Sequence, residues 1–345
     1  MSTSFRNSNF ELLRLFCIFG IVVMHTCGCL FSNSSTAVLI YLDAINTVFN
    51  TGVSIFVLIS GYFSINFKAR KLFSFWSQVL FCSLISWFIT SLIHDSFSIN
   101  GLLRSCLPIL TNKYWFATSY VVLMLFAPIL NIAVEKLSKQ CLVKIIISFF
   151  IVFSILPTFF YFGIPGSNKG ILQFFLMYLI GRYIASYMPV KSCNRRRIIW
   201  IAFFTFLLIY TLNLFATFLY RKYVNETGVV FLLSRDCSFF IIIASVLIFL
   251  LFRSFSIKST LINSIASHVF CIYLMEGAYR EVFRMFINIE DYANTLIFPF
   301  ALICFVLLVI VASSLTDVFR RIVLTHVEKK IWHLLERSYR RFVSS

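Results

Sequence analysis

The sequence is short of charge. Only 12% of its 345 residues are Asp, Glu, Lys or Arg, whereas soluble domains have about 25%. The side chains that would coat a water-facing surface are therefore too few, and an ordinary globular protein is excluded. Hydrophobic residues make up 60% of the chain, and the mean hydropathy is +0.92. Lipid must be the main solvent of such a chain, so the composition indicates an integral membrane protein.

Acidic residues are especially scarce. Thirteen Asp and Glu stand against thirty Lys and Arg, which gives a net charge of +17. In a soluble chain this excess would indicate a nucleic-acid partner. Here the basic residues stand mostly in short segments between apolar runs, and no RNA- or DNA-binding signature accompanies them. We therefore expect no nucleic-acid partner, and we assign the positive charge to membrane orientation and contact with anionic lipid headgroups.

Signatures of metal sites and of a cleaved leader are also missing. The ten cysteines are scattered, and none has the CxxC spacing of a zinc site, so we expect packing residues and no metal. The first apolar run lacks a signal-peptide cleavage pattern and is expected to be an uncleaved first span.

Apolar runs of about 18 to 25 residues predict ten transmembrane helices. The predicted spans are 10–31, 39–63, 72–93, 114–134, 142–162, 170–188, 197–220, 231–252, 266–287 and 295–319. They use almost all of the apolar content and leave no soluble domain. The predicted fold class is therefore all-α, a polytopic integral membrane protein with about ten transmembrane helices.

The basic residues predict the orientation of these spans. Of the thirty Lys and Arg, twenty fall on one side of the membrane and eight on the other, while Arg14 and Arg182 lie within or at the edge of spans. Because cytoplasmic segments carry the excess of positive charge, both termini are expected in the cytoplasm.

Residues 320–345 follow the last predicted span. An apolar stripe with basic residues around it predicts an amphipathic cytoplasmic helix on the inner leaflet, behind a transmembrane domain of residues 1–319. A plain solvated tail is the alternative. The stripe consists of Ile322, Val327, Ile331, Leu334 and Leu335.

The first span carries three ionisable residues, which are costly inside a bilayer. Arg14 and His25 are eleven residues apart, about three helical turns, so both project from one face about 16 Å apart along the axis. Glu11 is on the same stripe and can pair with Arg14. An Arg near a helix end often only snorkels, and a lone membrane His is often a packing residue. Together on one face, they indicate a polar interior.

A second cluster lies in the segment SGYF and the basic loop that follows it. Lys68, Arg70 and Lys71 enter a cytoplasmic loop where they would bind a phosphate-rich ligand, although anchoring by the positive-inside rule would also account for them. Ser60 and Tyr62 belong to the same segment. Trp115, in the YWF segment that opens the fourth span, suits a membrane interface.

These features together resemble membrane-bound acyltransferase family 3, the bacterial polysaccharide O-acetyltransferases. The resemblance is carried by NFELLR with Arg14 and His25, by SGYF with its basic loop, by the YWF segment and by the number of spans. It implies transfer of an acyl group from cytoplasmic acyl-CoA to a hydroxyl of a surface polysaccharide or its lipid-linked precursor. It also implies a bacterial inner-membrane location and an essential His25 and Arg14.

The match departs from the family pattern at two places. Lys68 and Lys71 occupy an Arg-x-x-Arg spacing, with Arg70 between them. Glu276 replaces a His in the ninth span, where it would hold a sugar hydroxyl or pair with an Arg.

We therefore expect His25 and Arg14 to be catalytic. Arg14, Lys68, Arg70 and Lys71 are expected to bind acyl-CoA, with acetyl-CoA as the implied donor and succinyl-CoA as the alternative. The substrate-contact candidates are Glu11, Ser60, Tyr62, Trp115 and Glu276.

Three questions stay open at the level of sequence. His25 would act either as a general base or as a transient acyl carrier. A transporter or flippase of lipid-linked sugar, which changes no covalent bond, would use the same polar stripe. A scaffold subunit is the third reading, and it predicts that Arg14 and His25 tolerate apolar replacement.

Overall fold

The structure is a computed structural model, and it describes residues 7–30, 36–160, 170–189, 194–224 and 233–344. Small parts of three predicted spans lie outside these ranges. They are residue 31 and residues 161–162, at the ends of two spans, and residues 231–232, at the start of a third. The described residues form α-helices and short helical turns, with no strand among them, as the all-α prediction requires.

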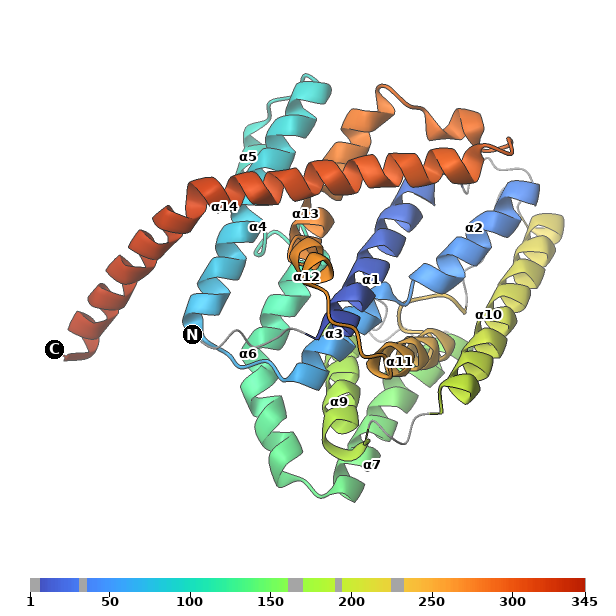
Figure 1. The fold of residues 1–345 in the computed structure, drawn as a ribbon, viewed down its shortest axis with the longest axis horizontal. Helices are drawn as coiled ribbons and strands as arrows, with labels where there is room; N and C mark the ends of the chain where they lie inside the picture. Colours follow the sequence, from blue (N-terminus) through green and yellow to red (C-terminus); the bar gives the residue numbers. More distant parts are fainter. Residues whose placement is uncertain (1–6, 31–35, 161–169, 190–193, 225–232, 345) are drawn as a thin grey trace.

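Fourteen α-helices run through the described residues (Figure 1). They are α1 (Ser8–Cys27), α2 (Thr36–Phe49), α3 (Gly52–Phe63), α4 (Ala69–Ile93), α5 (Ile99–Cys106), α6 (Trp115–Lys136), α7 (Lys139–Phe150), α8 (Leu156–Phe159), α9 (Ile171–Tyr187), α10 (Arg195–Tyr223), α11 (Phe239–Arg253), α12 (Thr260–Ala266), α13 (Val269–Arg284) and α14 (Phe298–Ser344). A π-helical turn, Ile151–Ile155, joins α7 to α8.

Seven helical segments are long and apolar enough to cross a membrane, or eight if α12 and α13 form one span bent by 50°. The predicted count of ten is therefore not confirmed. The remaining two predicted spans coincide with α9 and α11, which have 17 and 15 residues. Both helices are shorter than the roughly 20 residues that an untilted span needs. The chain is a multi-pass membrane protein by the length and apolar character of its helices.

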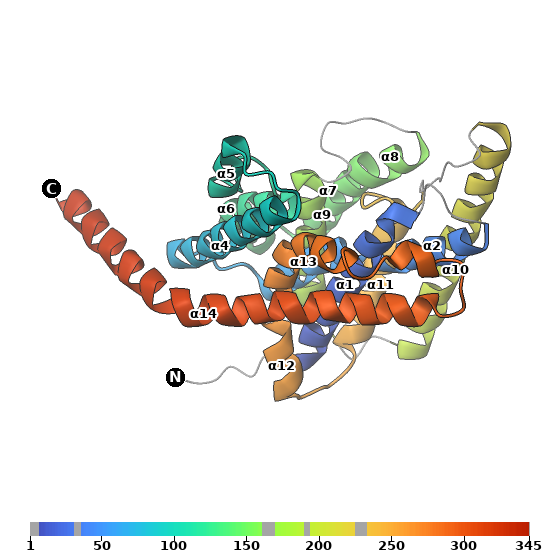
Figure 2. The same ribbon diagram turned by 90° about the horizontal axis from the view of Figure 1, so that it is seen from above.

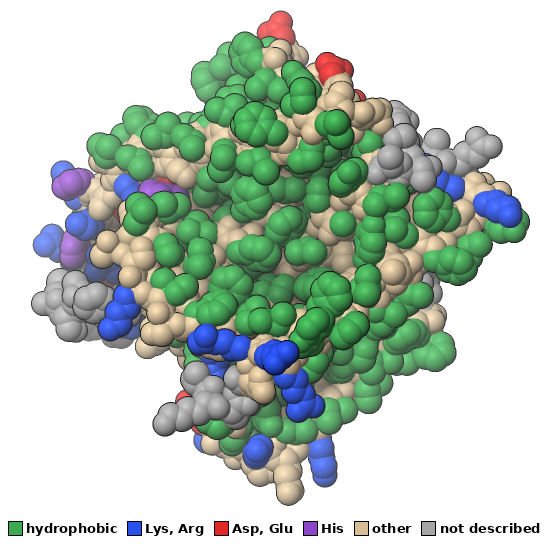
Figure 3. All heavy atoms as spheres, turned by 45° about the vertical axis from the view of Figure 1, so that its right-hand side comes forward, with side chains coloured by type: hydrophobic (Ala, Val, Ile, Leu, Met, Phe, Trp, Pro, Cys, Tyr) green, Lys and Arg blue, Asp and Glu red, His purple; other side chains and the backbone are tan. Residues whose placement is uncertain are grey.

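The outer helices present apolar side chains to their surroundings. Figure 3 shows such side chains over most of one face, with Lys and Arg toward its left, lower and right margins. On α10, which lies at the edge of the molecule in Figures 1 and 2, Trp200, Phe204 and Phe215 are all more than half exposed. Exposed aromatic residues of this number suit contact with lipid rather than water.

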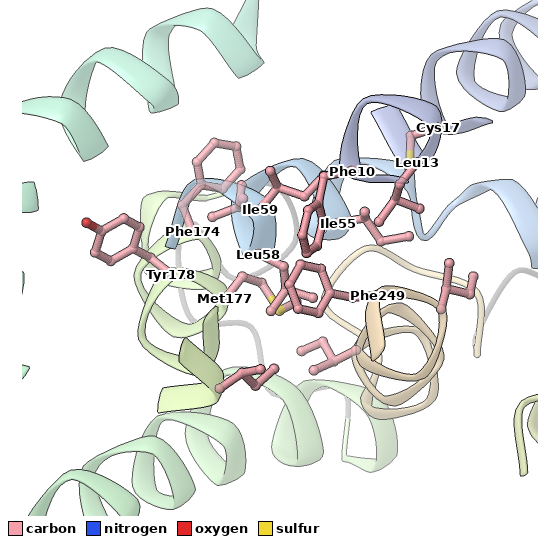
Figure 4. Packing of buried hydrophobic residues seen from close by; sticks show 14 of the residues in the cluster. Phe10, Leu13, Cys17, Ile55, Leu58, Ile59, Phe174, Met177, Tyr178 and Phe249 are labelled. Carbon is pink, nitrogen blue, oxygen red and sulfur yellow. The ribbon is translucent and has the colours of Figure 1, made fainter. Parts of the chain in front are cut away.

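Helix α1 lies at the centre and contacts α2, α3, α11, α12, α13 and α14. One face of it enters the main apolar cluster, in which Phe10, Leu13 and Cys17 meet side chains of α3, α9 and α11 (Figure 4). The aromatic rings of Phe10 and Phe249 lie 5.4 Å apart there. This packing fixes the rotation of α1, and the rotation decides where its polar stripe points.

Helices α3 and α9 approach each other at two glycines. Gly61 lies against the backbone of Tyr178, and Gly181 lies against the carbonyl of Leu58. A side chain at either position would overlap main-chain atoms, so the small residues are what allow this close contact.

Helix α14 continues without a break from the predicted last span into the predicted tail. Its 47 residues extend about 70 Å, longer than the roughly 30 Å hydrocarbon core of a bilayer. Figures 1 and 2 show its last part projecting from the body. The division at residue 319 stays a prediction. Beyond it, Trp332 packs on Phe73 of α4, with 5.8 Å between ring centroids, and Ser77 donates a hydrogen bond to Glu328.

The predicted apolar stripe of this segment is at least two-fifths exposed at every position, from Val327 and Ile331 to Ile322. Contact with the inner leaflet would cover this apolar stripe. The amphipathic membrane-surface helix stays a prediction.

We predict that Gly61→Ala separates α3 from α9 and lowers stability by about 1–3 kcal/mol, because the added methyl meets rigid backbone. The measurement is the thermal midpoint of the purified protein in detergent. Gly277→Ala is the matched control, because a methyl group there meets nothing within 4 Å. That variant should keep the wild-type midpoint or exceed it, since Ala favours a helix by about 1 kcal/mol over Gly. Equal midpoints for the two variants would contradict the packing assigned to Gly61.

Candidate functional site

A cavity of about 360 Å³ lies beside the central helix. Its walls come from α1, α3, α4, α6, the junction of α12 with α13, and the segment before α11. The lining residues are Arg14, Ile18, Ile21, Met24, His25, Asn50, Val53, Phe56, Ser60, Phe75, Trp115, Phe116, Tyr120, Asp236, Ala266, Ser267, Val269, Phe270 and Tyr273.

One stripe of α1 faces this cavity. Arg14, Ile18, Ile21 and His25 are spaced by four, three and four residues, which places them on a single side of an α-helix. The two ionisable groups predicted to share a face therefore line the same space. Three helical turns keep them about 16 Å apart along the axis.

His25 is held by a carboxylate on α13. Its Nδ1 lies 2.8 Å from Oε1 of Glu276. Because an ionised carboxylate only accepts hydrogen bonds, Nδ1 is the donor in this pair, and in a neutral imidazole Nε2 then has the lone pair. The imidazole remains accessible, with 45% of its side chain exposed, while the side chain of Glu276 is only 8% exposed. A buried acid thus orients an accessible base.

An arginine on α13 completes this arrangement. Nε of Arg280 donates to Oε2 of Glu276 over 2.6 Å, and its Nη1 donates to the backbone carbonyl of His25 over 2.7 Å. Arg284 donates to the carbonyl of Thr26 over 3.3 Å. The last carbonyls of a helix lack partners within the helix, so the two guanidinium groups also stabilise the end of α1.

The opposite end of the stripe is held by local pairs. Nη1 of Arg14 donates to Oε1 of Glu11 over 2.9 Å, which is the pairing that the i,i+3 spacing predicts. Ser60 and Tyr120, both on the cavity wall, have their hydroxyl oxygens 3.1 Å apart. This end therefore offers a guanidinium and two hydroxyl groups.

Aromatic rings from four helices, α3, α4, α6 and α13, form much of the remaining wall. Phe116 and Tyr120 stack at 5.8 Å on α6, and Phe75 of α4 stacks on Phe270 of α13 at 4.6 Å. Trp115 meets Phe116 edge to face at 6.1 Å. Such a wall is largely apolar, which strengthens the polar contacts made beside it.

The predicted substrate residues take different places. Ser60 and Trp115 line the cavity, while Glu11 and Glu276 lie behind it and hold Arg14 and His25. Tyr62 does not line it. Its ring packs in the main apolar cluster and lies under the guanidinium of Arg253, 5.5 Å from the ring centroid.

The three predicted phosphate-binding residues are exposed at the start of α4 and are not part of the cavity wall. Lys71 precedes the lining residue Phe75 by four positions, so it lies one turn away on the same side of α4. Lys68 precedes it by a further three. The basic group thus lies one to two turns from the cavity wall and is not part of it.

Several lining residues were missed from sequence, among them Asn50, Tyr120, Asp236 and Ser267. Asp236 had a usable signal, because it is an acid inside the predicted span 231–252. The spacing of Glu276 and Arg280, four residues apart on one helix, also predicts their pairing. No pattern in the sequence marks Asn50 or Tyr120.

The cavity offers a base, a guanidinium and polar side chains within an aromatic enclosure, which suits proton transfer from a hydroxyl group. In the parts of the chain that the structure describes, no cluster of three or more His, Cys, Asp or Glu side chains is arranged to hold a metal ion.

Comparison with known proteins adds one finding. A family model described as an acyltransferase domain matches residues 7–315, which include every residue of the cavity wall. No curated protein and no solved structure gives a significant match.

We predict that Glu276→Leu lowers stability by about 3–5 kcal/mol, because Arg280 then loses the carboxylate that pairs with it. The measurement is again the thermal midpoint in detergent. Glu281→Leu is the matched control on the same helix, since Glu281 pairs with His94 where both side chains are well exposed. Its effect should stay below about 1 kcal/mol. Equal losses in both variants would contradict the role assigned to Glu276.

Proposed function

Because the chain belongs to membrane acyltransferase family 3, we propose that it moves an acetyl group from cytoplasmic acetyl-CoA to a hydroxyl of a surface polysaccharide or its lipid-linked precursor. The family supports acyltransferase activity in a membrane. The donor and the acceptor are the parts that we propose.

The observation that carries this proposal is the single cavity that Arg14 and His25 both line. An extended pantetheine arm is of the same order of length as the roughly 16 Å that three helical turns put between the two residues. A donor held at its phosphates near Arg14 would therefore place its thioester beside His25.

His25 acts as the general base in the proposed reaction. Nε2 takes the proton of the acceptor hydroxyl while the hydroxyl oxygen attacks the thioester carbonyl carbon. The carbon–sulfur bond then breaks, and the leaving thiolate takes the proton from His25. One ester bond forms, and the free thiol of CoA leaves. Glu276 keeps the tautomer correct and stabilises the charged imidazolium, as the acid of a catalytic triad does.

The basic residues supply the donor end. CoA carries several phosphate charges, which Arg binds in bidentate fashion and Lys as a point charge. Arg14 lines the cavity, and Lys68, Arg70 and Lys71 are exposed at the start of α4, so together they would hold the nucleotide end. Their charge matches the ligand, and their exposure leaves them free of apolar packing.

The proposed orientation follows from charge. Twenty of the thirty Lys and Arg fall on the predicted cytoplasmic side, and this side includes the basic loop and both termini. Cytoplasmic acetyl-CoA would then meet the loop directly. We place the protein in the bacterial inner membrane, where surface glycans are built.

We predict that His25→Ala lowers acetyl transfer by about 10²–10⁴-fold, because the general base is removed. Glu276→Gln should also lower kcat at least about 100-fold, since an amide can donate to Nδ1 and move the hydrogen to Nε2. The measurements are CoA release with membranes that contain the acceptor, and the O-acetyl content of surface glycans in cells. His94→Ala is the control, because His94 also pairs with a glutamate but is exposed away from the cavity.

Three outcomes would contradict the proposed reaction. Survival of most activity in His25→Ala would show that His25 is not the general base. A burst of one equivalent of CoA per protein without acceptor would indicate an acyl-histidine in place of base catalysis. A wild-type protein that moves lipid-linked sugar across vesicles without releasing CoA would be a transporter.

We also predict that the double variant Arg70→Met, Lys71→Met raises the KM for acetyl-CoA by about tenfold or more, because charge-assisted contacts to phosphate are lost. The same variant should use acetyl-pantetheine, which lacks the nucleotide and its phosphates, as the wild type does. Lys136→Met, which removes another exposed charge from the predicted cytoplasmic side, is the control. An equal loss with both donors would show that the loop acts on folding rather than on phosphate.

A further inference from the structure

A second polar group lines the cavity apart from the His25 and Arg14 ends. It consists of Asn50, which follows α2, and Asp236, which precedes α11. Asp236 is only 7% exposed. The mechanism above uses neither residue, yet an amide and a carboxylate are costly in the interior of a membrane protein and indicate a function there.

Buried side chains hold this polar wall in place. Gln173 of α9 donates to Oγ of Ser54 over 3.2 Å and to the backbone carbonyl of Asp236. Asn50 donates to the backbone carbonyl of Ser234. Gln173 is 2% exposed, and Ser234 is 1% exposed. Two loops and the helices α3 and α9 are thus joined by hydrogen bonds at the back of the cavity.

A second layer fixes Ser234. Its hydroxyl accepts from Asn46 over 2.9 Å and from Asn213 of α10 over 3.1 Å, while Asn213 accepts from the backbone amide of Leu233 over 3.1 Å. Because several side-chain amides converge on Ser234, the network is rigid, and the groups that face the cavity are preorganised.

The wall lies between the two catalytic ends. Phe49 packs directly on Gly20, and the side chain of Ile21 lies against Gly52. Asn50 is therefore level with the middle of the stripe that runs from Arg14 to His25. Trp115 and Phe116 complete this part of the cavity with aromatic surface.

Charge separates the two ligands. CoA is strongly anionic at its nucleotide end, which favours the end with Arg14 and disfavours the carboxylate of Asp236. A neutral, hydroxyl-rich acceptor fits the opposite requirement: an ionised carboxylate accepts hydrogen bonds from hydroxyl groups, an amide both donates and accepts, and aromatic rings cover the apolar face of a sugar.

We propose that Asn50 and Asp236 form the acceptor subsite, which binds the hydroxyl groups of a sugar and holds one of them toward His25. This inference rests on the proposed function, and it adds the residues that recognise the acceptor.

The test uses the full chain in lipid nanodiscs, with n-octyl β-D-glucoside below its micelle concentration as the sugar probe. Binding of radiolabelled glucoside and of acetyl-CoA is measured separately for the wild type, Asn50→Leu and Asp236→Asn. The glucoside with all hydroxyls methylated controls for binding through the octyl chain. Asp43→Asn is the matched control variant, because Asp43 is a buried acid on α2 that does not line the cavity.

We expect Asn50→Leu and Asp236→Asn each to weaken glucoside binding by about tenfold or more, the loss of one hydrogen bond to a charged or polar partner. Acetyl-CoA binding should stay within about twofold of the wild type, and Asp43→Asn should bind both ligands normally. Methylated glucoside should bind all proteins equally weakly.

Three results would overturn the subsite: no glucoside binding by the wild type, unchanged glucoside binding in both cavity variants, or a loss of acetyl-CoA binding as large as that of glucoside. The last would assign the wall to the amides of pantetheine. A different pair of results separates the two proposals. If the variants lose glucoside binding while the wild type neither binds acetyl-CoA nor releases CoA, the sugar subsite is supported and the proposed acyl transfer is refuted.

Discussion

The hydrogen bond between His25 and Glu276 is the contact on which the site depends. It links the end of α1 to α13, and it settles which imidazole nitrogen is free. Without it, the imidazole would rotate about two side-chain bonds in an open cavity and present either nitrogen. Arg280 adds a third member, since it pairs with the carboxylate and also caps α1. The position of the base and the nitrogen that it turns toward Glu276 are thus set by one small cluster.

A wider constraint is the cost of polar groups away from water. Around the cavity the chain meets this cost by giving the polar side chains partners from neighbouring elements. Arg14 has Glu11, His25 has Glu276, and the Asn50 and Asp236 wall has Gln173 and Ser234 behind it. The outer surface of α10, by contrast, is rich in exposed aromatic residues. These polar side chains therefore lie inside the protein, whereas a soluble enzyme has most of its polar side chains on its surface.

The sequence predicts those features that depend on a single helix. The helical period alone puts Arg14 and His25 on one face, and the spacing of Glu11 and Arg14 gives their ion pair. Features made by distant segments escape it. Asn50 and Asp236 are 186 positions apart, and only the packing of α1, α3 and α11 brings them to one wall. Tyr62 shows the same limit, because its motif says nothing of the side on which Phe10 and Phe249 enclose it. The predicted count of ten spans is not confirmed for another reason. Helices α9 and α11 are short, and tertiary packing rather than length decides whether such helices cross the membrane.

One feature of α1 sets the scale of the whole site. Arg14 and His25 both belong to the same continuous helix. The distance between them is therefore set by a fixed number of peptide units and does not depend on how neighbouring helices pack. Loosening or tightening of the surrounding bundle changes the width of the space but not this length. The backbone of α1 therefore sets the length that any donor must have in order to reach from Arg14 to His25.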